Sequence, residues 1–586
     1  MGKLVRRLEA TRRVWRPGGA YLALFEQPQP VAAAPPPEAA HAEPVPHPLP
    51  AGFVDFPTTG GVLPREPVTI HGWALFASGP ATRVELWLGD TALGPARLGH
   101  YRPDVQLHYG LDGLIAGWEH IVDLGELAHP SGEVTVRAVA TGGEGERHEL
   151  ASVVAFVAPD VERRAPAQEE RKPQRAAPPP ADNGDLRLLT FTHRLDLGGA
   201  QLILQDLLLA MNRQAKIDCT VVSPTDGELR RPLEEAGIRV HVAGPILDND
   251  PTAYAGRIEE LAAWIAARGF DVALVNTALA FAGAEAAAQA GIPTLWAIHE
   301  SFSPATLWRV ACPWMHPDVR RRADASLAAA DAAIFEAEAT RQQFASHVKG
   351  PCMTRPYGLD LAALEAARAR FDGAQARRER GVPRGAQVVV AAGTAEPRKA
   401  QIPLVQAFGQ VARRYPDALL VVIGAGEDEY SRALHEYARG CAWANQVRVL
   451  PMISDIEPWY GLADLMVCAS DLESLPRSVL EAMWWETPVV ATAIFGLPDL
   501  IEHGRTGWLC EPRDVGALAG ALDLALGASD QERRAIMDAS RALVQERHDL
   551  EKYAADCARL LRSLARGDTL ADEPGTELSA ARKAVA

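Results

Sequence analysis

The stretch Asp471-Leu-Glu-Ser-Leu-Pro-Arg-Ser-Val-Leu-Glu481 lies between two apolar runs, Leu465–Ser470 and Pro488–Thr492. Short apolar runs of this kind are typical of buried parallel strands, so the stretch between them is predicted to be a loop that leads into a helix. Glu473 then stands at the carboxyl end of a strand, and Glu481 lies in the second turn of the helix. Open α/β sheets bind their ligands at that edge.

The residues between the two glutamates favour an anion. Ser474 is predicted to cap the helix and Pro476 to lie in its first turn, where free N–H groups and the helix dipole attract phosphate. The two oxygens of Glu481 match the cis-diol of a ribose, and Glu473 can accept hydroxyl groups of a sugar. The alternative is a pair of helix-capping carboxylates on the surface.

The composition is that of an ordinary globular protein. Of 586 residues, 48% are hydrophobic and 23% charged, and this length predicts more than one domain. The net charge of -16 argues against nucleic acid as a partner. The seven cysteines are scattered singly, which favours reduced thiols in the cytoplasm over disulfides or a zinc site. No apolar run is long enough for a transmembrane helix.

Proline- and alanine-rich stretches divide the chain. The first third contains short alternating apolar segments that predict an all-β sandwich. From residue 185 onward, apolar strands alternate with helices, which predicts two Rossmann-like α/β domains facing a cleft. The predicted boundaries are a basic segment and linker at 1–50, a β-sandwich at 51–158, a linker at 159–184, α/β domains at 185–365 and 366–567, and a tail at 568–586.

Other residues are expected at the same cleft. Arg398 and Lys399 follow a predicted strand, and adjacent cations there can clamp a pyrophosphate and stabilise its charge as it leaves. Gly199 lies in the first βα turn, where glycine allows a ligand to approach the backbone. His299 ends a predicted strand and can donate to a sugar hydroxyl; a histidine that only caps local structure is the alternative.

Taken together, residues 186–565 resemble the family 4 retaining glycosyltransferases of the GT-B fold. The matching features occur in the family's order, and the resemblance covers roughly two-thirds of the chain. They are Gly198-Gly-Ala200, His299-Glu300, Tyr357-Gly-Leu-Asp360, Arg398-Lys399, Glu473 to Glu481, Glu486-Thr-Pro-Val-Val-Ala-Thr492, Gly496-Leu-Pro-Asp499 and Gly504-Arg-Thr-Gly507.

The resemblance implies a UDP- or GDP-sugar donor held mainly by the second α/β domain, without cofactor or metal, and an acceptor held mainly by the first. It implies that Lys399 and Arg398 hold the diphosphate and Glu481 the ribose. Glu473 would hold the donor hexose together with backbone N–H groups of Ser474 and Leu475. His299 would contact the sugar near the reacting carbon, and Gly199 would lie beside the diphosphate or the acceptor.

Two positions depart from the family pattern. Thr394 stands where the family usually has arginine, and Ala400 stands where it usually has glycine. Loss of a cation weakens a phosphate clamp, although Arg398 can supply the charge. An inactive homologue therefore stays open as an alternative.

The expected function is hexosyl transfer to a glycan or lipid-linked acceptor in bacterial surface polysaccharide synthesis, in the cytoplasm or at the inner face of the plasma membrane. A non-catalytic glycan-binding protein and a nucleotide-sugar epimerase are the alternatives. The β-sandwich resembles Ig-like modules of some bacterial glycosyltransferases at Gly72-Trp-Ala74 and Arg102-Pro-Asp-Val105. Trp73, Trp87 and Trp118 could form a sugar-stacking platform; the alternative is that they are packed in the core. Trp308, Trp314 and Arg320–Arg322 could dock on a membrane; the alternative is a solvated helix with buried tryptophans. Asp248-Asn-Asp250 is predicted to be a turn rather than a metal site.

Overall fold

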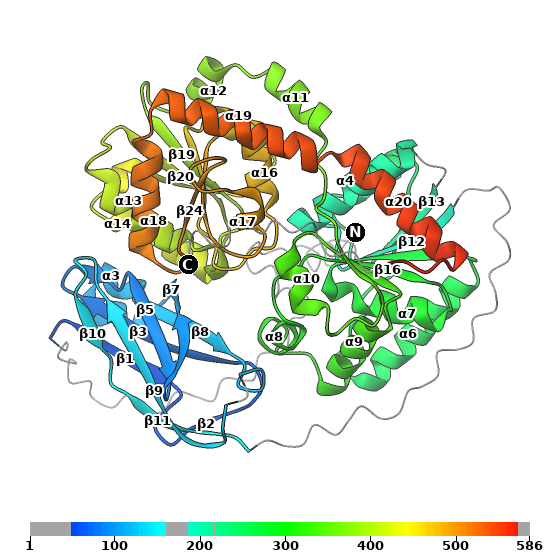
Figure 1. Ribbon diagram of the computed structural model, residues 1–586, viewed down its shortest axis with the longest axis horizontal. Coiled ribbons are helices and arrows are strands. Elements are labelled where there is room, and N and C mark those ends of the chain that lie inside the picture. Colours follow the sequence, from blue (N-terminus) through cyan, green and yellow to red (C-terminus); the bar gives the residue numbers. More distant parts are fainter. Residues whose placement is uncertain (1–47, 128, 160–185, 215–216, 572–586) are drawn as a thin grey trace, which may run out of the picture.

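The computed structural model describes residues 48–127, 129–159, 186–214 and 217–571. Three bodies are visible in Figure 1: a β domain (blue and cyan), an N-terminal α/β lobe (green) and a C-terminal α/β lobe (yellow to orange). Of the predicted segments 1–50, 159–184 and 568–586, residues 1–47, 160–184 and 572–586 lie outside the described residues.

The β domain consists of two sheets that share one apolar core. Alternate residues of its long strands are buried, as the period of two in the sequence predicts. Two short helices, α2 (Pro103–Tyr109) and α3 (Leu111–Leu114), interrupt the predicted all-β pattern. The strands of the first sheet are β1 (Ala51–Phe56), β3 (Val68–Phe76), β8 (Gly117–Val122) and β7 (Arg97–His100), with β4 (Gly79–Pro80) beside β3; those of the second are β2 (Val62–Leu63), β11 (Val153–Val157), β9 (Gly132–Thr141), β5 (Arg83–Leu88) and β6 (Thr91–Pro95), with β10 (Arg147–Glu149) beside β9.

Each α/β lobe contains a parallel sheet whose inner strands are almost wholly buried, because helices cover both faces, whereas the edge strands Arg239–Val242 and Val447–Pro451 are partly exposed. The order in the N-terminal lobe is β14 (Arg239–Val242), β13 (Ile217–Ser223), β12 (Leu186–Thr192), β15 (Val272–Asn276), β16 (Thr294–Ile298), β17 (Ala332–Phe335), β18 (Cys352–Thr354). In the C-terminal lobe it is β21 (Val447–Pro451), β20 (Ala418–Ala425), β19 (Gln387–Ala392), β22 (Leu465–Cys468), β23 (Val489–Thr492), β24 (Trp508–Cys510).

In both lobes the chain order reverses beside the first strand, β12 or β19, which creates the crevice where such sheets bind ligands. The helices of the N-terminal lobe are α4 (Gly199–Gln214), α5 (Arg230–Glu235), α6 (Pro251–Ala266), α7 (Phe281–Gln289), α8 (Pro304–Thr306), α9 (Pro317–Ala329) and α10 (Glu338–Phe344). Those that follow are α11 (Leu361–Ala369), α12 (Gly373–Glu379), α13 (Gln401–Ala412), α14 (Glu429–Gly440), α15 (Glu457–Leu462), α16 (Arg477–Trp484), α17 (Leu497–Leu500), α18 (Val515–Leu526), α19 (Asp530–Arg547) and α20 (Leu550–Arg566).

The last helix returns to the first α/β lobe. Helix α20, which the predicted boundaries place in the second α/β domain, packs against α4 (Figure 1). Asp556 on this helix pairs with Arg355 of the N-terminal lobe, 2.7 Å away. The chain therefore crosses between the lobes twice, and one apolar cluster contains residues of both.

The hypothesis of a sugar-stacking platform is wrong, and part of the predicted membrane-docking patch is buried. Trp118 is 1% exposed and Trp73 is 7% exposed, so these rings pack in the interior and cannot form a sugar-stacking platform with Trp87. Trp308 is also buried and donates to Asp324, and Arg322 pairs with Glu285 inside the N-terminal lobe.

Those contacts remove Trp308 and Arg322 from the predicted membrane-docking patch, which leaves docking without support. None of the helices in the described parts of the chain is both long and apolar enough to cross a membrane.

Candidate active site

A cavity of about 490 Å³ lies between the two α/β lobes at the carboxyl ends of their strands. Its size is that of a typical small-molecule site. All the residues that the sequence predicts for the site line it: Gly199, His299, Arg398, Lys399, Glu473, Ser474, Leu475 and Glu481. Lys399 and Glu481 thus face the same space, as a shared nucleotide site requires.

The two predicted cations follow strand β19 on the short helix η3 (Pro397–Lys399). Lys399 forms an ion pair with Glu473, and Arg398 lies 3.6 Å from the same carboxylate and 2.6 Å from Glu396. Burial would raise the pKa of Glu473, but Lys399 and Arg398 outweigh it and hold the pKa below its usual value. Glu473 is therefore an ionised acceptor that the two cations hold in place.

Ala400, the departure from the family's glycine, has the backbone conformation that glycine favours. Its φ is 52° and its ψ 36°, and it joins η3 to helix α13. An alanine in this left-handed region costs about 1–2 kcal/mol. The turn is thus preserved despite the substitution, and Lys399 keeps its place in the cavity.

Gly424, near the end of strand β20, lies against the loop that follows strand β19. A Cβ on Gly424 would come within 2.1 Å of the carbonyl oxygen of Gly393. A side chain at this position would displace the loop after β19, so Gly424 allows the two segments to pack closely.

Glu481 belongs to a chain of polar contacts that crosses the cleft. Its carboxylate accepts from Arg477 Nε at 2.6 Å and from Tyr460 Oη at 3.0 Å. Arg477 Nη1 also donates to Asp206 on helix α4 of the other lobe, 2.5 Å away. Burial opposes the charge of Arg477, but Glu481 and Asp206 raise its pKa. Sequence reasoning missed Asp206 and Tyr460 and gave Arg477 no role.

The predicted cap of helix α16 is wrong. The helix begins at Arg477, Pro476 occupies the N-cap position, and no side chain caps it. Ser474 Oγ instead lies 2.7 Å from Thr340 Oγ1 of the N-terminal lobe. The N-terminal lobe therefore provides the hydrogen-bond partner of Ser474, and the start of helix α16 does not.

The backbone N–H of Leu475 is also committed to the other lobe. It donates to Glu336 Oε1 at 3.1 Å, and the Leu475 carbonyl accepts from Tyr357 Oη at 3.0 Å. This N–H, which the family resemblance assigns to the donor sugar, already has a protein partner in this arrangement of the lobes.

His299 is held by acceptors at both ring nitrogens. Nδ1 lies 2.7 Å from Glu336 Oε2, and Nε2 lies 3.0 Å from Asn276 Oδ1. Asn276 Nδ2 donates to the Ala200 carbonyl, which turns its oxygen toward the histidine. Burial would lower the pKa of His299, but Glu336 outweighs it and raises the pKa. The acceptors at both ring nitrogens and the raised pKa favour the imidazolium form of His299, and Glu336 joins this side chain to Leu475.

The first βα turn completes the N-terminal side of the cavity. Gly199 is the first residue of α4, and a Cβ placed there would meet no atom within 4 Å. Its neighbourhood is therefore open toward the cavity, which fits the predicted approach of a ligand. His193 beside it bonds to Thr277 Oγ1 at 2.8 Å, and burial lowers its pKa to about 3, so it is neutral.

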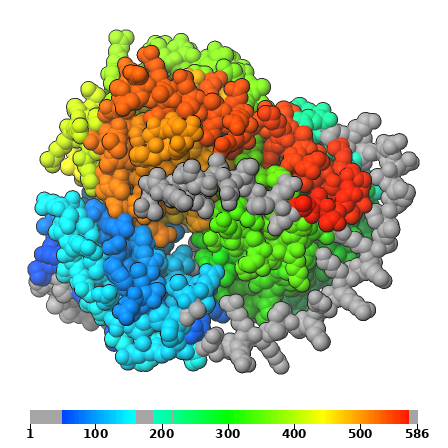
Figure 2. All heavy atoms as spheres, viewed as in Figure 1, coloured from blue at the N-terminus to red at the C-terminus, as the bar shows by residue number. Residues whose placement is uncertain are grey.

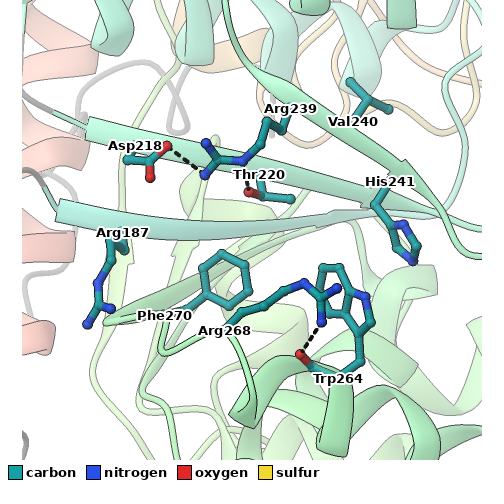
Figure 3. Close-up of a pocket in the computed structure, with 9 residues that line it drawn as sticks. All are labelled: Arg187, Asp218, Thr220, Arg239, Val240, His241, Trp264, Arg268 and Phe270. Carbon is teal, nitrogen blue, oxygen red and sulfur yellow. Dashed lines mark hydrogen bonds and ion pairs between the residues drawn. The ribbon is translucent and has the colours of Figure 1, made fainter.

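A second cavity, of about 350 Å³, lies at the opposite ends of the strands of the N-terminal lobe (Figure 3). Its arginines have partners within the protein: Arg187 pairs with Asp271 at 2.8 Å and Arg239 with Asp218 at 2.6 Å. Arg268 lies over the ring of Trp264, 4.0 Å from its centroid. This cavity has the character of a structural crevice and is separate from the inter-lobe site.

The Asp248-Asn-Asp250 turn is confirmed: the carboxylate of Asp250 caps helix α6 and Pro251 follows at N1. Across the described ranges, no group of three or more His, Cys, Asp or Glu side chains is arranged to hold a metal ion. All seven cysteines lie within the described ranges, and each is a buried thiol rather than half of a disulfide. Metal independence of the reaction stays a prediction.

Fold and site together define a two-lobe α/β protein of the GT-B class. The family "Glycosyltransferase Family 4" matches residues 197–363, and "Glycosyl transferases group 1" matches residues 373–542. Each family model covers one lobe. These matches, with the fold, support a family 4 glycosyltransferase of the GT-B fold.

Similar proteins include the D-inositol 3-phosphate glycosyltransferase of Corynebacterium urealyticum, which is 29% identical over 46% of this chain and 67% of its own length. A GDP-mannose-dependent alpha-(1-6)-phosphatidylinositol monomannoside mannosyltransferase of Mycobacterium tuberculosis is 30% identical over 40% of this chain and 62% of its own. An uncharacterized glycosyltransferase of Haemophilus influenzae is 29% identical over 27% of this chain, and only 44% of its length is spanned.

Among solved structures, Anabaena HepE in complex with UDP-glucose superposes with a TM-score of 0.55 at 24% identity, over 64% of this chain and 100% of that chain. Sucrose-phosphate synthase from Thermosynechococcus elongatus superposes with the same TM-score of 0.55 at 21% identity, over 65% of this chain and 100% of that chain. At this level of identity the likeness shows the fold.

Proposed function

We propose that the protein is a glycosyltransferase that moves a hexose from a nucleotide-diphosphate sugar to a glycan or lipid-linked acceptor, with retention of anomeric configuration and without a metal. The observation that carries the proposal is the convergence of Lys399, Arg398, Glu473 and Glu481 on one cavity between two lobes of a GT-B fold. Cytoplasmic synthesis of a bacterial surface polysaccharide is the setting we propose.

In this function Lys399 and Arg398 bind the diphosphate. Both now contact Glu473, so an incoming phosphate competes with that carboxylate for the two cations. Charged hydrogen bonds to phosphate are short and strong, which favours the exchange. Glu473, once released, accepts hydroxyl groups of the donor sugar beside the reacting carbon.

Glu481 accepts the two hydroxyl groups of the ribose. One of its oxygens contacts Arg477 and the other contacts Tyr460, which fixes the carboxylate in a single orientation. A carboxylate fixed in this way binds a cis-diol without first losing rotational freedom. Removal of Glu481 therefore weakens the ribose contact and also frees Arg477.

Transfer breaks the bond between the anomeric carbon and the diphosphate oxygen, and forms a bond from that carbon to an acceptor oxygen. The acceptor proton passes to an oxygen of the leaving phosphate. Lys399 and Arg398 stabilise the negative charge that grows on the diphosphate, and the His299 imidazolium adds a positive charge on the opposite wall. Contacts between the lobes exclude water from the reaction.

Anabaena HepE was solved with UDP-glucose and the Mycobacterium tuberculosis relative is GDP-mannose-dependent, so the nucleotide base that this protein prefers must be tested. Thermal unfolding with UDP, GDP and ADP should show stabilisation by one of them, since a ligand that binds only the folded state raises Tm. Product analysis with the matching sugar donor, with and without acceptor glycans, distinguishes a glycosyltransferase from a nucleotide-sugar epimerase. An altered sugar nucleotide in the donor-only reaction would indicate an epimerase, and no stabilisation by any nucleotide would contradict the proposal.

A further inference from the structure

The β domain lies directly against the C-terminal lobe (Figures 1 and 2). A single apolar cluster contains core residues of both, including Leu98 and Trp118 of the β domain and Ile402 and Leu518 of the lobe. Hydrogen bonds also cross the boundary: the Val515 N–H donates to the Thr82 carbonyl at 3.0 Å. The two bodies therefore share a core, as parts of one folding unit do.

Strand β7 of the β domain lies behind the donor-binding loops. It packs against η3, the helix that carries Arg398 and Lys399. At Gly99, whose φ is 77°, a Cβ would come within 2.9 Å of Pro403, in the first turn of helix α13. This close approach requires glycine on β7 and places the strand beneath the turn that follows Lys399.

The same strand carries a buried arginine that faces the loop of Glu473. Arg97 is 8% exposed and Asp471 is 4% exposed. Arg97 Nη1 binds Glu119 at 2.8 Å, while its Nε lies 3.7 Å from Asp471 Oδ2. Among the described residues, neither that Nε nor that Oδ2 has a hydrogen-bond partner, so the ion pair joins two buried atoms that are otherwise without one.

Asp471 is linked to the donor site on its other side. Its backbone N–H donates to the Arg398 carbonyl at 2.7 Å, and Glu473, two residues later, pairs with Lys399. Burial raises the pKa of Asp471 to about 6, while Arg513 and Arg97 oppose that rise and Glu119 adds to it. Removing Arg97 would therefore leave a buried carboxylate with one cation fewer, next to the loop that binds donor.

We infer that the β domain is a fixed part of the donor-binding lobe, and that Arg97 is a positioning residue that holds the Asp471–Glu473 loop and the adjoining Arg398–Lys399 turn through Asp471. The consequence for donor binding rests on the proposed function. The positioning of the loops does not, because it concerns only contacts within the protein.

The test compares Arg97→Met with Arg83→Met in the full chain. Arg83 is a matched control because it also joins the β domain to the C-terminal lobe, through Asp514 at 3.0 Å, but it does not reach the donor loops. Hydrogen exchange followed by mass spectrometry should show at least roughly tenfold faster exchange in peptides covering residues 397–401 and 471–475 of Arg97→Met. Arg83→Met should leave these peptides unchanged.

Two further variants separate positioning from general stability. Arg97→Lys keeps the charge and should retain most of the protection, whereas Asp471→Asn should lose it in the same peptides. The dissociation constant of the nucleotide that stabilises the wild type should rise about tenfold in Arg97→Met and stay unchanged in Arg83→Met.

Unchanged exchange in both Arg97→Met and Asp471→Asn would overturn the inference. So would faster exchange spread equally over the C-terminal lobe in Arg97→Met and Arg83→Met. A wild type that binds none of UDP, GDP and ADP would contradict the proposed function, while the exchange pattern would still decide whether Arg97 positions the loops.

Discussion

The carboxylate of Glu336 accepts a hydrogen bond from the backbone N–H of Leu475, 3.1 Å away, although the two residues belong to different lobes. The other oxygen of Glu336 accepts from His299, 2.7 Å away. One buried carboxylate thus joins the charge on the N-terminal wall of the cleft to the loop that carries Glu473. We therefore expect closure of the lobes and protonation of His299 to be coupled through Glu336.

Replacing Glu336 with glutamine should weaken both contacts. A hydrogen bond to a charged group contributes about 1.5–3 kcal/mol, so we expect a roughly ten- to hundredfold lower kcat/KM. The pKa of His299 should fall at the same time, which NMR titration of the imidazole would detect. Glu338→Gln is the control, because Glu338 pairs with Arg341 outside the cleft. A His299 pKa that is the same in Glu336→Gln and wild type would refute the coupling.

The coupling also predicts a pH dependence of stability. The pKa of His299 is raised in the folded protein because Glu336 outweighs the effect of burial. A raised histidine pKa means that its stabilising contribution is complete below the unfolded value of about 6.5 and is lost as pH rises through the folded value. The Tm difference between wild type and His299→Gln should therefore shrink as pH increases through that range. A difference that grows with pH would show that the imidazolium is not the stabilising form.

The ribose role of Glu481 can be tested with a modified nucleotide. Glu481→Ala should weaken binding of the preferred nucleoside diphosphate about tenfold or more, since two hydrogen bonds are lost. The 2′,3′-dideoxy analogue of that nucleoside diphosphate should bind the wild type and Glu481→Ala with the same affinity in calorimetric titrations. Glu502 is an exposed glutamate paired with Arg505, and Glu502→Ala should change the affinity for neither nucleotide. An equal loss for both nucleotides would instead indicate that the variant disrupts Arg477.

The diphosphate role of Lys399 needs the complementary comparison. Lys399→Ala should weaken binding of the nucleoside diphosphate at least tenfold but leave binding of the nucleoside alone unchanged. The reason is that, of the parts of the nucleotide, Lys399 is proposed to contact the phosphates and not the nucleoside. The pKa of Glu473 should rise in this variant, since Lys399 is the largest of the charges that lower it. Undiminished affinity for the diphosphate would exclude Lys399 from the site.

Sequence patterns predicted the parallel sheets and the edge at which the site lies, because buried parallel strands such as Val388–Ala392 leave continuous apolar runs. Every predicted site residue lines the inter-lobe cavity. The short strand β14 (Arg239–Val242) has the polar residues Arg239 and His241 along one face and left no such signal.

The partners that cross the cleft could not be predicted, because they depend on how two lobes meet. Asp206 is a single, half-buried acidic residue on helix α4, and no local sequence pattern indicates that it pairs with Arg477. Ser474 has the local signature of a helix cap, yet Thr340 of the other lobe overrides it. Likewise, the proline-rich linkers indicated a separable β domain, whereas tertiary packing merges its core with the C-terminal lobe.

The most direct measurement of the central claim is a crystal structure of the protein with its preferred nucleoside diphosphate. The account predicts phosphate oxygens within hydrogen-bond distance of Lys399 Nζ and both ribose hydroxyl groups on the carboxylate of Glu481. A nucleotide bound elsewhere, or bound in the cleft with its phosphates turned away from Lys399, would contradict it.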